Sequence, residues 1–66
     1  MNVEINGNIV QIPDHSTVYT VLLLKNIKPE KVLICLNEEV INRSQLETTI
    51  LNEQDRIDII GIVGGG

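Results

Sequence analysis

The sequence is poor in aromatic side chains. Among its 66 residues there is no tryptophan or phenylalanine, and Tyr19 is the only aromatic residue. Proteins that bind nucleic acids stack bases on aromatic rings or cluster Lys and Arg against phosphates, whereas here five basic residues are scattered among nine acidic ones. We therefore expect no nucleic acid among the partners of this chain.

Cysteine and histidine are almost as scarce. A single cysteine, Cys35, cannot form an internal disulfide, which favours an intracellular protein. Cys35 alternates with apolar residues, so we interpret it as a packed or idle thiol rather than a sulfur-relay nucleophile. The single histidine, His15, has no partners at metal-ligand spacing and is interpreted as a solvated turn residue. We interpret Glu38 and Glu39 as surface charge.

Long apolar runs are also absent. No run approaches the roughly 20 residues that a membrane span needs, and the first residues do not form a signal-peptide pattern. With 42% hydrophobic residues and a net charge of -4, the composition is that of one globular domain. We expect a cytoplasmic protein that does not associate with membranes and is a monomer when alone.

The first half of the chain predicts a hairpin followed by a helix. Residues 1–6 alternate apolar and polar side chains, Asn6-Gly7 suits a tight turn, and residues 9–12 form a return strand. Ser16 or Thr17 is expected to cap a helix that runs to about residue 26. Its buried stripe is formed by Val18, Val21 and Leu22, and is widened by Leu23 and Leu24, one of which is expected to be partly exposed or to cover the end of the sheet.

The second half predicts three more strands. Residues 32–37 have apolar side chains on both faces, which predicts a central strand, and residues 40–41 form a short one. Residues 43–51 are expected to form a polar crossover that tucks Leu46, Ile50 and Leu51 under the sheet. Residues 56–63 give the clearest strand pattern.

This order of elements predicts an α+β fold. One main helix packs on a mixed sheet of four to five strands, as in the β-grasp or ubiquitin-like roll. We expect the β-grasp domain to span residues 1–63 and residues 64–66 to form a flexible C-terminal glycine tail.

Packing does not explain the three glycines Gly64, Gly65 and Gly66. Glycine buries no side chain and loses the most backbone entropy on ordering. A stalk without Cβ atoms can thread a narrow channel, and the unhindered carboxylate of Gly66 is a suitable group for activation by ATP. The pattern indicates a chain that is the substrate of other enzymes and not itself an enzyme.

A set of short motifs, in a fixed order and spacing, runs through the whole chain. They are Val3-x-Ile5-Asn6-Gly7, Thr17-Val18, Val21-Leu22, Val32-x-Ile34-x-Leu36-Asn37-Glu38, Val40-x-x-Arg43, and Asp55-Arg56-Ile57-Asp58-Ile59 continuing to Val63-Gly64-Gly65-Gly66. With these motifs the whole chain resembles the ThiS family, the sulfur carriers of thiamin (thiazole) biosynthesis. Two departures, Gln54 in place of a turn glycine and Lys25 in place of an apolar helix residue, concern the scaffold.

The resemblance implies the chemistry and the partners. An E1-like adenylyltransferase of the ThiF type would use ATP to adenylate the Gly66 carboxylate, and no cofactor would be bound by the chain itself. Sulfur supplied by a cysteine desulfurase would convert the carboxylate to a thiocarboxylate, from which a thiazole synthase of the ThiG type would take the sulfur. On this hypothesis Gly64 and Gly65 belong to the tail that enters the partners.

The alternation that continues past Ile59 places Ile60 and Ile62 on the outward face of the last strand. If exposed, they form a docking patch for the activating enzyme; a bulge would instead return them to the core.

Three other functions stay open at this point. The chain could be a sulfur carrier for molybdopterin or another pathway, although its length and triple glycine disfavour the molybdopterin synthase subunit. It could be a ubiquitin-like modifier joined to lysines, because adenylation also precedes that chemistry. It could also be a β-grasp binding module with inert glycines.

Overall fold

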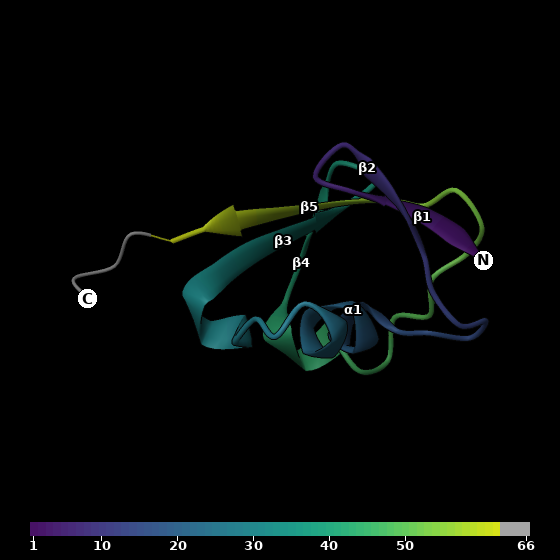
Figure 1. Ribbon diagram of the computed structural model, residues 1–66. Coiled ribbons are helices and arrows are strands. Elements are labelled where there is room, and N and C mark those ends of the chain that lie inside the picture. The colour runs from purple at the N-terminus through teal and green to yellow at the C-terminus, as the bar shows by residue number, and fades with distance from the viewer. Residues whose placement is uncertain (63–66) are drawn as a thin grey trace.

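The strands of the computed structural model, which describes residues 1–62, form one five-stranded mixed sheet in the order β2-β1-β5-β3-β4 (Figure 1). A single α-helix lies against one side of this sheet. The elements are β1 (Asn2–Ile5), β2 (Asn8–Gln11), α1 (Val18–Leu24), the 3-10 turn η1 (Pro29–Lys31), β3 (Val32–Leu36), β4 (Glu39–Ile41), the 3-10 turn η2 (Arg43–Gln45) and β5 (Arg56–Gly61). The predicted α+β, β-grasp order is confirmed.

The first hairpin forms where the sequence predicts it. β1 and β2 pair antiparallel, and the turn places Asn6 at φ 48° and Gly7 at φ 85°. These positive φ values are accessible to Asn and Gly at low cost, which is why this dipeptide closes the hairpin. Ile12 lies just beyond β2 and is buried.

Helix α1 begins at the predicted cap and ends early. The Thr17 hydroxyl accepts a hydrogen bond from the Thr20 amide at 3.2 Å, and the Thr17 amide donates to the Thr20 hydroxyl at 3.1 Å. The helix ends at Leu24 rather than near residue 26, because Asn26 adopts a left-handed φ of 57°. Leu23 and Leu24 are 61% and 60% exposed, so both, and not just one of them, lie toward solvent.

Residues 46–51 fasten the start of α1 to the rest of the domain. The amides of Val18 and Tyr19 donate to the carbonyls of Thr49 and Leu46 at 3.1 and 2.9 Å, and the Leu51 amide donates to the Ser16 carbonyl at 2.8 Å. Leu46 and Leu51 are buried as predicted.

The prediction that Ile50 tucks under the sheet is wrong. Its backbone pairs with Thr17 in an isolated antiparallel bridge, so successive side chains alternate, and Ile50 lies outward, 57% exposed, while Leu51 lies inward.

The core fills the space between α1 and the facing side of the sheet. The buried apolar residues are Val3, Ile5, Ile12, Val18, Val21, Leu22, Ile34, Leu46, Leu51 and Ile57.

Within the described residues no helix is long and apolar enough to cross a bilayer.

Strand β5 lies at the centre of the sheet. It pairs parallel with β1 and antiparallel with β3. The prediction that residues 32–37 form the central strand therefore needs correction, since β3 is an inner strand but one place off centre. β5 ends at Gly61, opposite Val32 where β3 begins, and not at the predicted residue 63, which lies outside the described residues.

Two turn asparagines bind β5 through their side-chain amides. Asn37 accepts from the Arg56 amide at 2.9 Å and donates to the Asp55 carboxylate at 3.1 Å. Asn6 accepts from the Ile59 amide at 2.7 Å and donates to the Ile59 carbonyl at 3.2 Å. The Asn6 side chain thus continues the β1–β5 ladder after the β1 backbone has turned away.

Replacing Asn6 by glycine tests this clamp, because glycine keeps the positive φ and removes only the side chain. We expect Asn6→Gly to lower the free energy of unfolding by about 1–3 kcal/mol, since two hydrogen bonds to β5 are lost. Asn26→Gly is the matched control: Asn26 has a similar φ of 57° and no side-chain hydrogen bond among residues 1–62. Denaturant unfolding of the two variants gives the comparison, and equal effects would contradict the clamp.

Candidate functional site

The candidate site is the end of β5, from which the chain continues to the glycines. Ile62 follows the strand directly, and its amide donates to the Lys31 carbonyl at 3.0 Å. The last described residue is therefore tied to the turn that precedes β3. The predicted tail residues Gly64, Gly65 and Gly66, together with Val63, lie outside the described residues.

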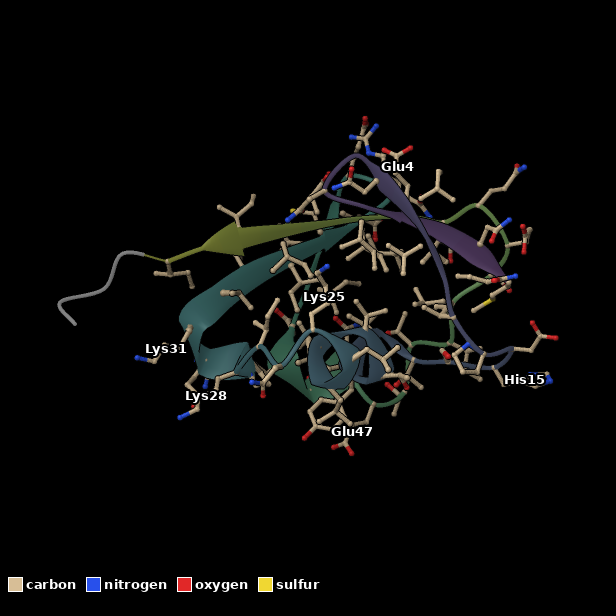
Figure 2. The ribbon with its side chains drawn as sticks, in the orientation of Figure 1. Glu4, His15, Lys25, Lys28, Lys31 and Glu47 are labelled. Carbon is tan, nitrogen blue, oxygen red and sulfur yellow. The ribbon has the colours of Figure 1, made fainter. Side chains whose placement is uncertain are left out.

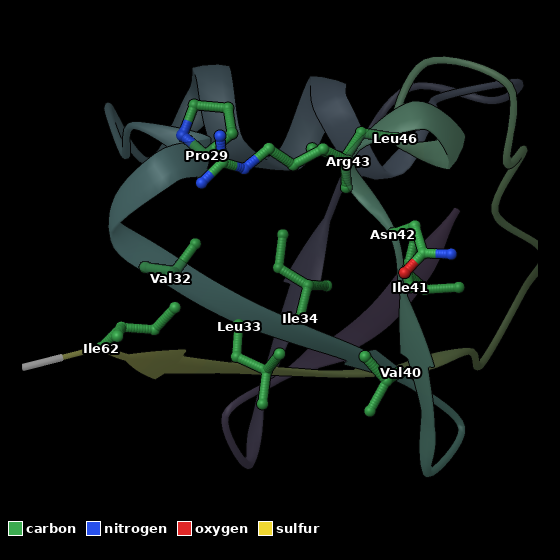
Figure 3. A pocket seen from close by; sticks show the side chains of 10 residues that line it. All are labelled: Pro29, Val32, Leu33, Ile34, Val40, Ile41, Asn42, Arg43, Leu46 and Ile62. Carbon is green, nitrogen blue, oxygen red and sulfur yellow. The ribbon is translucent and has the colours of Figure 1, made fainter. Parts of the chain in front are cut away.

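An apolar patch lies beside this point on the face of the sheet that turns away from α1. Ile60 and Ile62 are 50% and 53% exposed. Ile60 lies directly opposite Leu33 in an unbroken β3–β5 register, so no bulge interrupts the alternation and Ile60 lies outward as predicted. The prediction that Ile62 shares this face is wrong: Ile62 follows the end of β5, and its side chain lies on the side of Val32, opposite to Leu33 and Val40 (Figure 3). We call the three outward residues, Leu33, Val40 and Ile60, the outer patch.

Sequence reasoning missed Leu33 and Val40 as members of this patch. The apolar side chains on both faces of residues 32–37 were interpreted as a sign of burial on both sides. In the structure the second face is uncovered, and Leu33 and Val40 are 39% and 56% exposed. The signal that could have identified them is the cross-strand pairing of Leu33 with Ile60 and of Val40 with Cys35, which requires the register of these strands.

A groove of about 200 Å³ opens next to the outer patch (Figure 3). It lies where β3 and β4 diverge, between the two 3-10 turns, and its sides are formed by Pro29 of η1 and Arg43 of η2. The Arg43 side chain extends across the opening toward the side of Pro29. The groove also borders Ile62, so it adjoins the start of the predicted tail. The remaining lining residues are Val32, Leu33, Ile34, Val40, Ile41, Asn42 and Leu46.

Positive charge gathers at this end of the molecule. Lys28 precedes η1 and Lys31 is its last residue, on the side where β5 ends (Figure 2), and Arg43 borders the groove. All three side chains are exposed, and none lies within 4.0 Å of a carboxylate among residues 1–62. Of the nine acidic residues only Glu30 belongs to η1.

The other candidate residues do not form a reactive centre. Cys35 is half-buried on the outward face of β3, opposite Val40 and Asp58 in the neighbouring strands. His15 is exposed at a turn, with φ 67°. Glu38 is exposed and lies 3.7 Å from Arg56, which agrees with its interpretation as surface charge. Among residues 1–62 no three His, Cys, Asp or Glu side chains gather as a metal site.

The fold and the exposed strand end define the class of this molecule as a small ubiquitin-like β-grasp domain whose chain leaves the sheet toward a glycine-rich end. The ThiS family model matches residues 2–66. The chain therefore belongs to the ThiS family.

Solved structures and curated relatives agree with this assignment. The crystal structure of the thiamine biosynthesis protein ThiS from Geobacter metallireducens is similar with a TM-score of 0.84 and 29% identity, covering 100% of both chains. A thiazole synthase of Magnetococcus marinus is 29% identical over 66 residues, and the chain spans only 20% of its length. An uncharacterised protein of Pyropia yezoensis, of which the chain covers 93%, is also 29% identical.

Family membership also clarifies one of the departures noted in the sequence. Gln54, which stands where the family often has a turn glycine, adopts a left-handed φ of 70°. A conformation that glycine adopts at low cost is therefore held here by a residue with a side chain.

Proposed function

We propose that this chain is a sulfur carrier for the formation of the thiazole ring of thiamin and that its reactive group is the carboxylate of Gly66. The observation that carries the proposal is the match of the ThiS family model, which runs through the glycines to residue 66. In this scheme the chain contributes no catalytic residue, and partner enzymes perform each step.

The proposed chemistry begins on an E1-like adenylyltransferase of the ThiF type, which binds ATP. The Gly66 carboxylate attacks the α-phosphate, forming an acyl-adenylate and releasing pyrophosphate. A persulfide sulfur supplied by a cysteine desulfurase then attacks the acyl carbon, and AMP leaves. A second thiol cleaves the sulfur–sulfur bond, which leaves a thiocarboxylate on Gly66. A thiazole synthase of the ThiG type takes up this sulfur.

The end of β5 suits the delivery of a carboxylate to such a site. Ile62 is held to the Lys31 carbonyl, so the start of the tail has a fixed position on the domain. Four further residues span at most about 14 Å when extended. The acyl-transfer site of a partner must therefore lie within about that distance of the surface that contacts Ile62. Glycines allow the approach because they have no Cβ atoms to clash with a narrow channel.

The outer patch supports the proposal because it offers a docking surface next to the tail. Leu33 and Ile60 lie outward on the face that α1 leaves uncovered, and exposed apolar patches of this kind mark interaction sites. A partner that covers the patch would have the start of the tail at its own surface.

Adding one alanine after Gly66 tests the role of the carboxylate. We expect the natural chain to support ATP–pyrophosphate exchange by a ThiF-type enzyme, and then sulfide-dependent thiazole formation with a ThiG-type synthase. The extended chain should support neither, because the glycyl carboxylate has become an amide, while its thermal unfolding stays unchanged. Equal activity of both chains would contradict the role of the Gly66 carboxylate, and no exchange with either chain would favour a binding module with inert glycines. Exchange followed by lysine-linked conjugates instead of sulfur transfer would favour a modifier.

Replacing Ile60 by aspartate tests the outer patch. We expect Ile60→Asp to raise the carrier concentration needed for half-maximal adenylation by about tenfold or more, which corresponds to about 1.4 kcal/mol of docking energy. Ile9→Asp is the matched control, since Ile9 is 69% exposed on β2, away from the end of β5. Unfolding curves for both variants check the fold. If Ile60→Asp needs the same carrier concentration for half-maximal adenylation as the natural chain, the outer patch is not the docking surface.

A further inference from the structure

The charges of this small domain are separated along β5. Near the start of the strand lie Glu38, Glu53 and Asp55, and Glu38 pairs with Arg56. Near its end lie Lys28, Lys31 and Arg43, which are three of the five basic residues of a chain with a net charge of -4. The order of residues in the sequence hides this separation, because Arg43 reaches the end of β5 only through the turn that follows β4.

The groove between Pro29 and Arg43 combines this charge with an apolar lining. An enclosed apolar cavity of about 150 Å³ holds a benzene molecule, so the volume of about 200 Å³ suffices for one apolar side chain. Val32 and Leu46 line the groove, and the Arg43 guanidinium extends over its opening. A segment that inserts an apolar side chain here would bring its neighbouring residues against the three cations.

We propose that this groove receives an apolar side chain of the activating enzyme whose flanking carboxylates pair with Arg43, Lys28 and Lys31. The proposal rests on the proposed function, because it takes the adenylating enzyme as the partner. It extends the contact at the outer patch into the adjoining groove, which shares Leu33 and Val40 with the patch, and it gives that contact a charge. The partner surface around the entrance of its nucleotide site would accordingly be acidic.

Charge complementarity is the observation that selects this occupant. The three cations have no carboxylate within 4.0 Å among residues 1–62, so a partner that pairs with them breaks no ion pair of the domain. The rest of this acidic chain repels an acidic surface, whereas the end near Ile62, with Lys28, Lys31 and Arg43 against Glu30, has a net positive charge and attracts it. Such a distribution orients the carrier before contact and raises the association rate more than the final affinity.

The geometry disfavours the phosphates of ATP as the group that meets these cations. Lys31 and Arg43 lie at the base of the tail, whereas Gly66 is up to about 14 Å further along an extended chain. When Gly66 meets the α-phosphate, the three cations therefore remain near the entrance of the site, where protein carboxylates can face them.

The test measures adenylation of the Arg43→Glu carrier by a ThiF-type enzyme over a range of carrier and salt concentrations. At about 50 mM NaCl we expect the half-saturating carrier concentration to rise about tenfold or more, and at about 500 mM the difference from the natural chain should largely disappear because salt screens exposed pairs. The maximal rate at saturating carrier should stay the same, since Arg43 does not reach the reacting atoms.

Lys25→Glu is the matched control, because it makes the same change of net charge on an exposed residue outside the groove. Its effect should be under about threefold at either salt concentration. Unfolding curves of both variants check the fold. Equal half-saturating concentrations for Arg43→Glu and the natural chain at low salt would overturn the proposal while leaving the proposed function intact. Equal effects of Arg43→Glu and Lys25→Glu would overturn it as well, since net charge alone would then explain them. If the natural chain were not adenylated at all, the proposed function would fail, and this inference with it.

Discussion

The structure depends on the way β5 is held between β1 and β3. One edge of the strand pairs parallel with β1 at Arg56 and Ile57, and the other edge pairs antiparallel with β3 from Ile57 to Gly61. Asn37 and Asn6 add side-chain hydrogen bonds at Arg56 and Ile59. A strand held in this way has a fixed position up to its last residues, although the domain is too small to bury a large core. The segment that carries the proposed reactive group can then lie outside the sheet and still begin at a defined position on the domain.

This arrangement gives the two faces of the sheet different tasks. The face toward α1 supplies the core, with Ile57 of β5 among its fully buried residues. The opposite face keeps apolar side chains in solvent at the end near the glycines, where Leu33 and Ile60 pair across two strands. Exposed apolar pairs cost solubility and add little to the stability of the isolated chain, and their position next to Ile62 supports the proposed docking role.

Local chemistry made part of the fold predictable from the sequence. The Asn6-Gly7 turn and the Thr17 cap follow from backbone preferences of a few neighbouring residues, and the structure has both. The exposure of Ile60 followed from strand alternation alone. These features require no knowledge of which strands lie side by side.

Contacts between residues far apart in the sequence determine the features that the sequence alone did not predict. Ile50 lies outward because its backbone bridges Thr17, and Leu33 is exposed because no layer covers the second face of β3. The binding of Ile59 by Asn6 spans 53 residues of sequence. The grouping of Arg43 with Lys28 and Lys31 likewise arises only when η1 and η2 come to the same groove. The residues of the tail were identified from glycine chemistry and family resemblance, and their role remains a prediction.

The intact mass of the chain after incubation with ATP, a ThiF-type activating enzyme and sulfide tests the central claim most directly. The account predicts a gain equal to the replacement of one oxygen by one sulfur, localised to Gly66 by fragmentation and absent when ATP is omitted. An unchanged mass, obtained with an enzyme that converts its own carrier under the same conditions, would contradict it.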